Sequence, residues 1–229
     1  MPLIGVARGI YLIGGPMLTN MLDANVYLIL SEKRKGVVID SGTGLGFENM
    51  LRNILELKVN PIKDLEYVIL THCHIDHAGG ASALYYGLGL KTVAHEPDSL
   101  FIRKGDSDKT LAKKFGLEFK PSPITINLRR KSEALEVDGA IFEIIHTPGH
   151  TQGSISVYFE VHGNKVLALG DTIPFNEQVF IEDFHAWKKS LSKILQYDFE
   201  IVLGGHGYIS KDGKTFIEEL LARLENEMV

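Results

Sequence analysis

The 229-residue chain contains one cysteine, Cys73, and lacks any apolar run long enough to cross a membrane. A single cysteine excludes an intrachain disulfide, which is typical of a protein in a reducing compartment. The first eight residues lack the apolar core of a secretory signal. We therefore expect a soluble cytoplasmic protein with no membrane partner.

The chain also lacks an excess of positive charge, with 24 Lys and Arg against 29 Asp and Glu and a net charge of −5. This balance argues against the broad basic field of a nucleic-acid binder. Three short basic runs, at 113–114, 129–131 and 188–189, are expected to be solvated surface charge. Length and composition predict one globular domain over residues 1–229, and they are compatible with a homodimer.

Hydrophobic patterning predicts strands that alternate with helices. Strands are predicted at 9–13, 25–30, 36–39, 67–70, 92–95, 135–137, 141–145, 154–159, 166–169 and 201–203. Helices are predicted over 47–57, 78–86 and 183–195, and from Gly213 onward. The close spacing of the first three strands predicts an antiparallel meander. Residues 97–123 are irregular and fit either a lid over a substrate or a plain connector.

The densest chemistry-bearing segment follows a predicted apolar strand directly. Within six residues it holds His72, His74, Asp76 and His77. Imidazole and carboxylate groups suit zinc, iron and manganese alike. Alternate residues of an extended segment point the same way, so His72 and His74 can face one metal while Cys73 points away and packs. The loop that follows lets Asp76 and His77 face a second metal position.

Further ligands must come from other parts of the chain, because one loop cannot surround two metals. Three later segments place a histidine or an aspartate beside glycine just after a predicted strand, at His150, Asp171 and His206. Glycine permits tight turns and the close backbone approach that a crowded centre needs. The predicted metal ligands are His72, His74, Asp76, His77, His150, Asp171 and His206.

This order of residues resembles the metallo-β-lactamase superfamily along almost the whole chain. The resemblance implies an α/β fold of the αββα type, a four-layer sandwich of two mixed sheets with helices on both outer faces. It also implies a two-metal site at one edge of the sheets. The first ion would be held by His72, His74 and His150, and the second by Asp76, His77 and His206, with Asp171 between them.

The resemblance implies two further roles. Asp40 matches an early strand-end aspartate of the family and would either support the site without touching a metal or serve only in a turn. Asp76 would act as a catalytic residue that passes a proton to the leaving group. Two divalent ions, zinc first with iron or manganese as alternatives, would supply a hydroxide because bound water has a pKa of ~7.

Residues 147–154 are similar to the glyoxalase II-like branch of the family. We therefore predict a metal-dependent hydrolase whose metal-bound hydroxide attacks the carbonyl of a small-molecule thioester or carboxylic ester. Residues 207–229 leave room for one helix after His206. This branch member would then lack the C-terminal extension with which glyoxalase II binds glutathione, so we expect a different thioester or ester as substrate.

Other activities share this architecture. A lactonase would use the same attack on a cyclic ester. A persulfide dioxygenase with one iron shares the Thr-His-Cys-His segment, but it has a Gly-Arg-Thr-Asp-Phe run where this chain has Thr-Ile-Pro-Phe-Asn at 172–176. A nuclease of the ribonuclease Z type is disfavoured by the acidic charge, and a non-catalytic binding module by the complete ligand set. His185 and Tyr208 fit either a pocket or a packing role, and His146 a packing or surface role.

Overall fold

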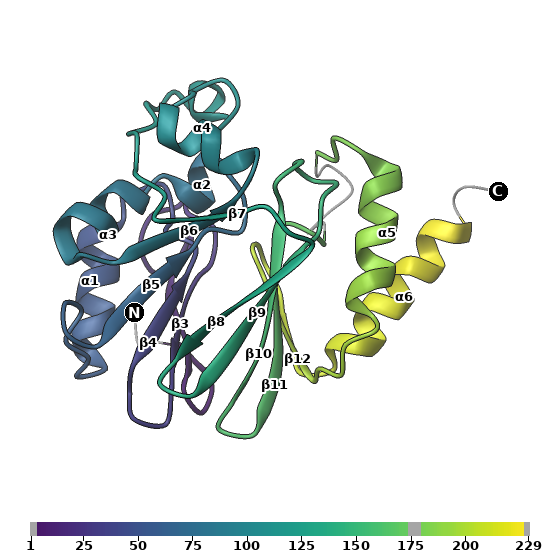
Figure 1. Ribbon diagram of the computed structural model, residues 1–229, viewed down its shortest axis with the longest axis horizontal. Coiled ribbons are helices and arrows are strands. Elements are labelled where there is room, and N and C mark those ends of the chain that lie inside the picture. Colours follow the sequence, from purple (N-terminus) through teal and green to yellow (C-terminus); the bar gives the residue numbers. More distant parts are fainter. Residues whose placement is uncertain (1–3, 174–179, 227–229) are drawn as a thin grey trace.

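The computed structural model describes residues 4–173 and 180–226, which form four layers (Figure 1). A seven-stranded sheet has the order β1-β2-β3-β4-β5-β6-β7, and a six-stranded sheet has the order β13-β12-β11-β10-β9-β8. Helices α1 to α4 lie outside the first sheet, and α5 and α6 lie outside the second (Figure 1). The predicted αββα sandwich is therefore confirmed.

The first sheet is mixed. Its strands are β1 (Ile4–Ala7), β2 (Ile10–Gly14), β3 (Val26–Leu30), β4 (Gly36–Ile39), β5 (Leu65–Ile69), β6 (Lys91–His95) and β7 (Ile126–Leu128). The strands from β1 to β4 pair antiparallel, as the predicted meander requires, and those from β4 to β7 pair parallel. The short edge strands β1 and β7 were absent from the sequence prediction.

The second sheet is also mixed. It contains β8 (Ser132–Val137), β9 (Ala140–His146), β10 (Ile155–Val161), β11 (Asn164–Gly170), β12 (Ile201–Gly204) and β13 (Ile209–Ser210). Pairing is antiparallel except between β11 and β12. On its outer face lie α5 (Phe184–Ile194) and α6 (Gly213–Asn226). The Asp183 side chain begins α5 by accepting a hydrogen bond from the backbone N–H of Ala186 at 2.9 Å.

Three apolar cores separate the four layers, and β3 shows why its sequence is continuously apolar. All five of its residues are buried. Tyr27 and Ile29 point into the core between the sheets, while Val26, Leu28 and Leu30 point into the core beneath the first set of helices. A strand covered on both faces needs apolar side chains on both. A third core fills the space between the second sheet and α5 and α6.

The helices outside the first sheet differ in one place from the prediction. They are α1 (Phe47–Glu56), α2 (Ile75–Ala78), α3 (Ala81–Leu88) and α4 (Asp98–Lys104). The helix predicted over 78–86 is thus two helices, and Asp76 and His77 lie in the short α2 rather than in a loop. Gly80 follows α2, where a Cβ would collide with the carbonyl oxygen of Ser41. This close approach turns the chain between the two helices.

Residues 97–123, considered as a lid or a connector, contain α4 and a 3₁₀ turn at Ala112–Phe115. Ile102, Ala112 and Phe119 are fully buried in the core beneath the first set of helices. The segment is therefore anchored to the fold at three points. Whether any part of it closes over a substrate stays a prediction.

Candidate metal centre

All seven predicted ligands meet at one edge of the two sheets. His72, His74, Asp76 and His77 follow β5, whereas the other three side chains follow strands of the second sheet. The donor atoms form three mutually close groups: His72 with His74 and His150, His72 with His77 and Asp171, and Asp76 with His77 and His206. The structure thus brings the predicted residues together, and their role as ligands stays a proposal.

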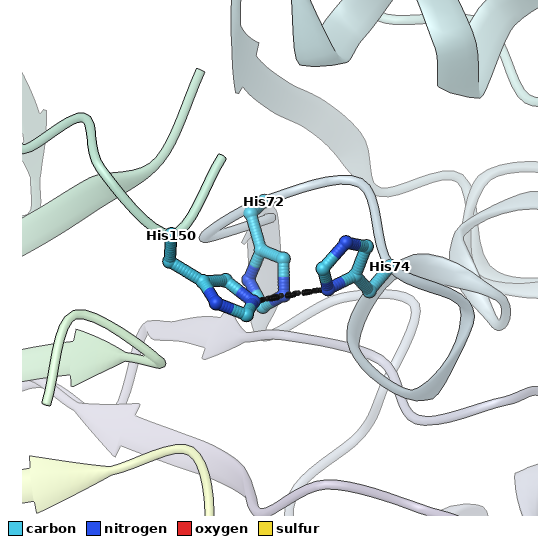
Figure 2. Close-up of side chains that lie close together, drawn as sticks. All are labelled: His72, His74 and His150. Atoms are coloured by element: carbon cyan, nitrogen blue, oxygen red, sulfur yellow. Dashed lines mark hydrogen bonds between the residues drawn. The ribbon is translucent and has the colours of Figure 1, made fainter. Parts of the chain in front are cut away.

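The first group consists of three histidines that converge on one point (Figure 2). Nε2 of His150 lies 3.2 Å from Nε2 of His72 and 3.0 Å from Nδ1 of His74, and the last two nitrogens are 3.1 Å apart. The three rings are nearly perpendicular to one another, at 82°, 85° and 86°. Zinc–nitrogen bonds of ~2.0–2.1 Å in a tetrahedron place nitrogens ~3.3 Å apart, so this triangle fits one ion.

The second group is formed by Asp76, His77 and His206. Nε2 of His206 lies 3.1 Å from Oδ2 of Asp76 and 3.3 Å from Nε2 of His77. The remaining distance, from Nε2 of His77 to Oδ2 of Asp76, is 3.7 Å. Asp76 is 8% exposed and His77 is fully buried. A mixed set of imidazole and carboxylate donors at this spacing fits a second divalent ion.

Asp171 lies between the two groups. Its Oδ1 is 3.2 Å from Nε2 of His77, and its Oδ2 is 3.6 Å from Nε2 of His150 and 3.5 Å from Nε2 of His206. Burial alone would raise its pKa, but His77, His206 and His150 hold the pKa well below its ordinary value. The carboxylate is therefore ionised and within reach of both groups, as the bridging role requires.

The pKa values of His72, His74 and His77 are shifted in different directions. Burial, and next the charge of His150, lower the pKa of His74 to about 3. Burial also lowers the pKa of His72 well below its ordinary value. Burial would lower the pKa of His77 too, but the surrounding carboxylates, Asp171 first, raise it well above that value. Neutral imidazoles and ionised carboxylates are the forms in which these side chains bind metals.

Three histidines are oriented through their second ring nitrogen. His150 donates from Nδ1 to the carbonyl oxygen of Phe180 at 2.6 Å, and His77 donates from Nδ1 to Oδ2 of Asp40 at 2.8 Å. Thr71 donates its hydroxyl to Asp40 and can accept from Nδ1 of His72 at 3.1 Å. Such partners fix the tautomer and leave Nε2 facing the centre. Asp40 thus contacts the predicted ligand His77, as a supporting role requires, and that role stays a proposal.

Glycine at 205 is required by the crowding of the centre. A Cβ at this position would collide with Oδ1 of Asp171 and the ring of His77. The N–H of Gly205 donates to the carbonyl oxygen of Gly170 at 2.8 Å, which joins the segments that carry Asp171 and His206. The glycine beside each predicted ligand was expected for this reason.

Asp98 is a supporting residue that the sequence analysis missed. It begins α4 and is 1% exposed. Its carboxylate accepts from the backbone N–H of Cys73 at 2.8 Å, the hydroxyl of Thr151 at 2.7 Å and the N–H of Gly153 at 2.8 Å. It therefore ties the segment that carries His72 and His74 to the loop that carries His150. The available signal was an acid shortly after the strand predicted at 92–95, whereas Asp40 was identified by its match to an aspartate of the family.

The remaining candidates lie outside the three donor groups. Cys73 is buried among apolar side chains, as strand alternation predicted. Tyr208 donates to the carbonyl oxygen of Ile173 at 3.3 Å and packs on Phe216, and His185 lies on the outer face of α5. His146 stacks on His95 with ring centroids 3.9 Å apart. Residues 174–176, used above against a dioxygenase, lie outside the described residues.

Comparisons with known proteins agree with this geometry. The family model of the metallo-beta-lactamase superfamily matches residues 20–206. A probable metallo-hydrolase of Methanocaldococcus jannaschii is 35% identical over 66% of this chain and 68% of its own. The hydroxyacylglutathione hydrolase GloC of Haemophilus influenzae is 30% identical over 83% of this chain and 88% of its own.

Solved structures support the fold. A metallo-beta-lactamase variant of Cronobacter sakazakii superposes with a TM-score of 0.80 and 19% identity over 100% of this chain and 97% of that one. The chain belongs to the metallo-β-lactamase superfamily, and the two relatives described above are named as a probable metallo-hydrolase and a hydroxyacylglutathione hydrolase. Among the described residues, every helix is too short or too polar to cross a lipid bilayer.

Proposed function

We propose that this chain hydrolyses small-molecule thioesters or carboxylic esters with the help of two divalent ions, zinc in the first instance. The observation that carries the proposal is the pair of donor groups with the Asp171 carboxylate between them. The similarity to a hydroxyacylglutathione hydrolase over most of both chains supports a thioester as the substrate class.

When bound, two divalent ions would acidify a water molecule and polarise the substrate carbonyl. The three histidines of the first group would hold one ion, and the Asp171 carboxylate between the groups would contribute negative charge to both. Asp76 is the side chain proposed to handle the proton, because its Oδ2 lies 3.1 Å from Nε2 of His206, the partly exposed member of the second group. We assign it the transfer of the water proton to the departing thiolate or alkoxide.

The test combines elemental analysis with a substrate screen. Purified protein is expected to contain roughly two metal ions per chain. It should hydrolyse an uncharged thioester and an aryl ester, lose this activity on chelation and recover it when zinc is restored. A chelated protein that is free of metal and fully active would overturn the proposal.

The other activities are outcomes of the same screen. Turnover of lactones alone would replace the proposed function with that of a lactonase. Turnover of phosphodiesters alone would replace it with a nuclease. About one iron per chain with oxygen uptake on a persulfide substrate would replace hydrolysis with dioxygenation.

A further inference from the structure

Lys131, from one of the short basic runs, and Lys193 both contact the strand end that precedes the loop carrying His150. The N–H of His146 donates to the carbonyl oxygen of Lys131 at 3.0 Å, and Nζ of Lys193 donates to the carbonyl oxygen of His146 at 2.6 Å. Lys131 belongs to the run at 129–131, and Lys193 lies one helical turn after the run at 188–189. Residues about 60 positions apart in the sequence therefore flank one histidine.

The outer face of α5 continues this positive charge. The helix presents an open surface depression whose lining residues are all basic or uncharged: His185, Lys188, Lys189, Ser192, Lys193 and Gln196. They recur three or four positions apart, so they share one face of the helix. Lys189 and Lys131 are exposed. We call Lys131, His185, Lys189 and Lys193 the cationic face; it lies on a chain whose net charge is −5.

Helix α5, which carries most of this face, is joined by hydrogen bonds to the loop that carries His150. The N–H of Asp183, just before α5, donates to the carbonyl oxygen of Gly149 at 3.0 Å. The hydroxyl of Ser190 donates to the carbonyl oxygen of Pro148 at 2.8 Å. Four residues from His146 to His150 span at most ~14 Å. A substrate of the length of an ordinary cofactor can therefore reach from the metal centre to the cationic face.

We propose that the cationic face binds a phosphate or pyrophosphate group on the thiol portion of the substrate, so that the preferred thioesters are those of a phosphorylated thiol. This proposal rests on the proposed function and specifies its substrate class. Lysine ammonium groups bind phosphate as point charges.

The electrostatics of the face favour a small, multiply charged anion. Burial, and next the charge of Lys131, lower the pKa of Lys193, so an anion that lies between the two amines would relieve their repulsion. Glu143, on the neighbouring part of β9, already accepts hydrogen bonds from Ser132 and Tyr197 at 2.7 Å. The face is short and the chain as a whole is acidic, which favours one phosphate-bearing molecule over a long polyanion.

The test compares two thioesters with the same acyl group. Acetyl-coenzyme A carries phosphates on its thiol portion, and the acetyl thioester of N-acetylcysteamine carries none. In the double variant Lys131→Gln/Lys189→Gln, KM for acetyl-coenzyme A should rise about tenfold with kcat unchanged, because two lysine–phosphate attractions are lost. KM for the neutral thioester should not change. Lys63→Gln, an exposed lysine beside the first sheet, is the matched control.

Several results would overturn the proposal. These are equal changes in KM for the two thioesters, a tenfold rise in KM for acetyl-coenzyme A in Lys63→Gln, or the same rise in KM in the double variant with a carboxylate-bearing glutathione thioester. Binding of single-stranded RNA that is lost in the double variant, without discrimination between the thioesters, would reassign the face to nucleic acid. If wild-type protein hydrolyses neither thioester, the proposed function fails by itself. Calorimetry with inorganic pyrophosphate then tests whether the cationic face binds phosphate groups. Binding must be present in wild type and weakened in the double variant.

Discussion

Two buried aspartates make hydrogen bonds to the segments that carry the predicted metal ligands, and they act in different ways. Asp40, at the end of β4, accepts from the ring of His77, the N–H of Thr71 at 2.7 Å and the hydroxyl of Thr71 at 2.9 Å. Asp98, at the start of α4, accepts from two backbone N–H groups and one hydroxyl. Asp40 therefore orients a predicted ligand directly, whereas Asp98 holds the backbone that carries ligands.

The backbone conformations of the two residues fit this difference. Asp40 has a positive φ of 63°, a conformation that aspartate tolerates better than most residues because its short side chain bonds locally. Asp98 lies in a regular helix, and it joins segments from both sheets, at Cys73 and at Thr151 to Gly153. One carboxylate orients a predicted metal ligand, and the other stabilises the junction of the two sheets at the edge that carries the predicted ligands.

The largest effect on activity is expected at Asp171, which lies between the two donor groups. The variant Asp171→Ala should lose hydrolysis by at least ~10³-fold and retain less metal, because the carboxylate between the donor groups is gone. Circular dichroism should show an intact fold. Asp198→Ala, which removes a carboxylate at an exposed position, is the control. Unchanged turnover in the Asp171 variant would remove its bridging assignment.

Asp40→Asn should come next. An amide in place of this carboxylate weakens the hydrogen bond that orients His77, so zinc affinity should fall by about 10–100-fold, as for other partners of metal-binding histidines. Competition with a chromogenic chelator measures this affinity. The loss should fall mainly on the ion held by Asp76, His77 and His206. Equal weakening of both ions would show that Asp40 does not act through His77.

Asp98→Asn should separate stability from metal binding. Replacing one acceptor oxygen with an amide group leaves a buried N–H without its partner, which costs about 1–3 kcal/mol in the free energy of unfolding. Urea denaturation of the chelated protein measures this loss, with Asp198→Asn as the control. Zinc affinity should change less than in Asp40→Asn. If this variant loses more free energy of zinc binding than free energy of unfolding, the two aspartates act alike.

The same contrast explains what the sequence could and could not predict. The strands, the order of layers and the seven clustered side chains follow from patterns that are local in the sequence, such as the apolar run of β3 and the spacing of His72 to His77. Asp40 was found because it matches a strand-end aspartate of the family that the sequence resembles. Asp98 was missed because two of its three donors are backbone N–H groups, which leave no trace in residue identity.

Other features depend on tertiary contacts that no local pattern encodes. The division of one predicted helix into α2 and α3 follows from the approach of Gly80 to the backbone of Ser41, about 40 residues away. The meeting of Lys131 and Lys193 beside His146 depends on the packing of α5 against the second sheet. The separate basic runs were therefore read as isolated surface charge.

The smallest effect is expected at Cys73, between the two predicted metal ligands that it separates. Asp98 holds this residue through its backbone N–H, and the thiol is buried with Sγ 3.6 Å from the carbonyl oxygen of Lys109. Burial, and next the charge of Asp98, raise the pKa of this thiol well above its ordinary value, so it stays protonated and is a poor ligand. Cys73→Ala should therefore keep its full metal content and turnover, and lose about 1 kcal/mol of stability from reduced packing. Loss of metal in this variant, measured by elemental analysis, would place the thiol in the centre and show that Asp98 supports the side chain as well as the backbone.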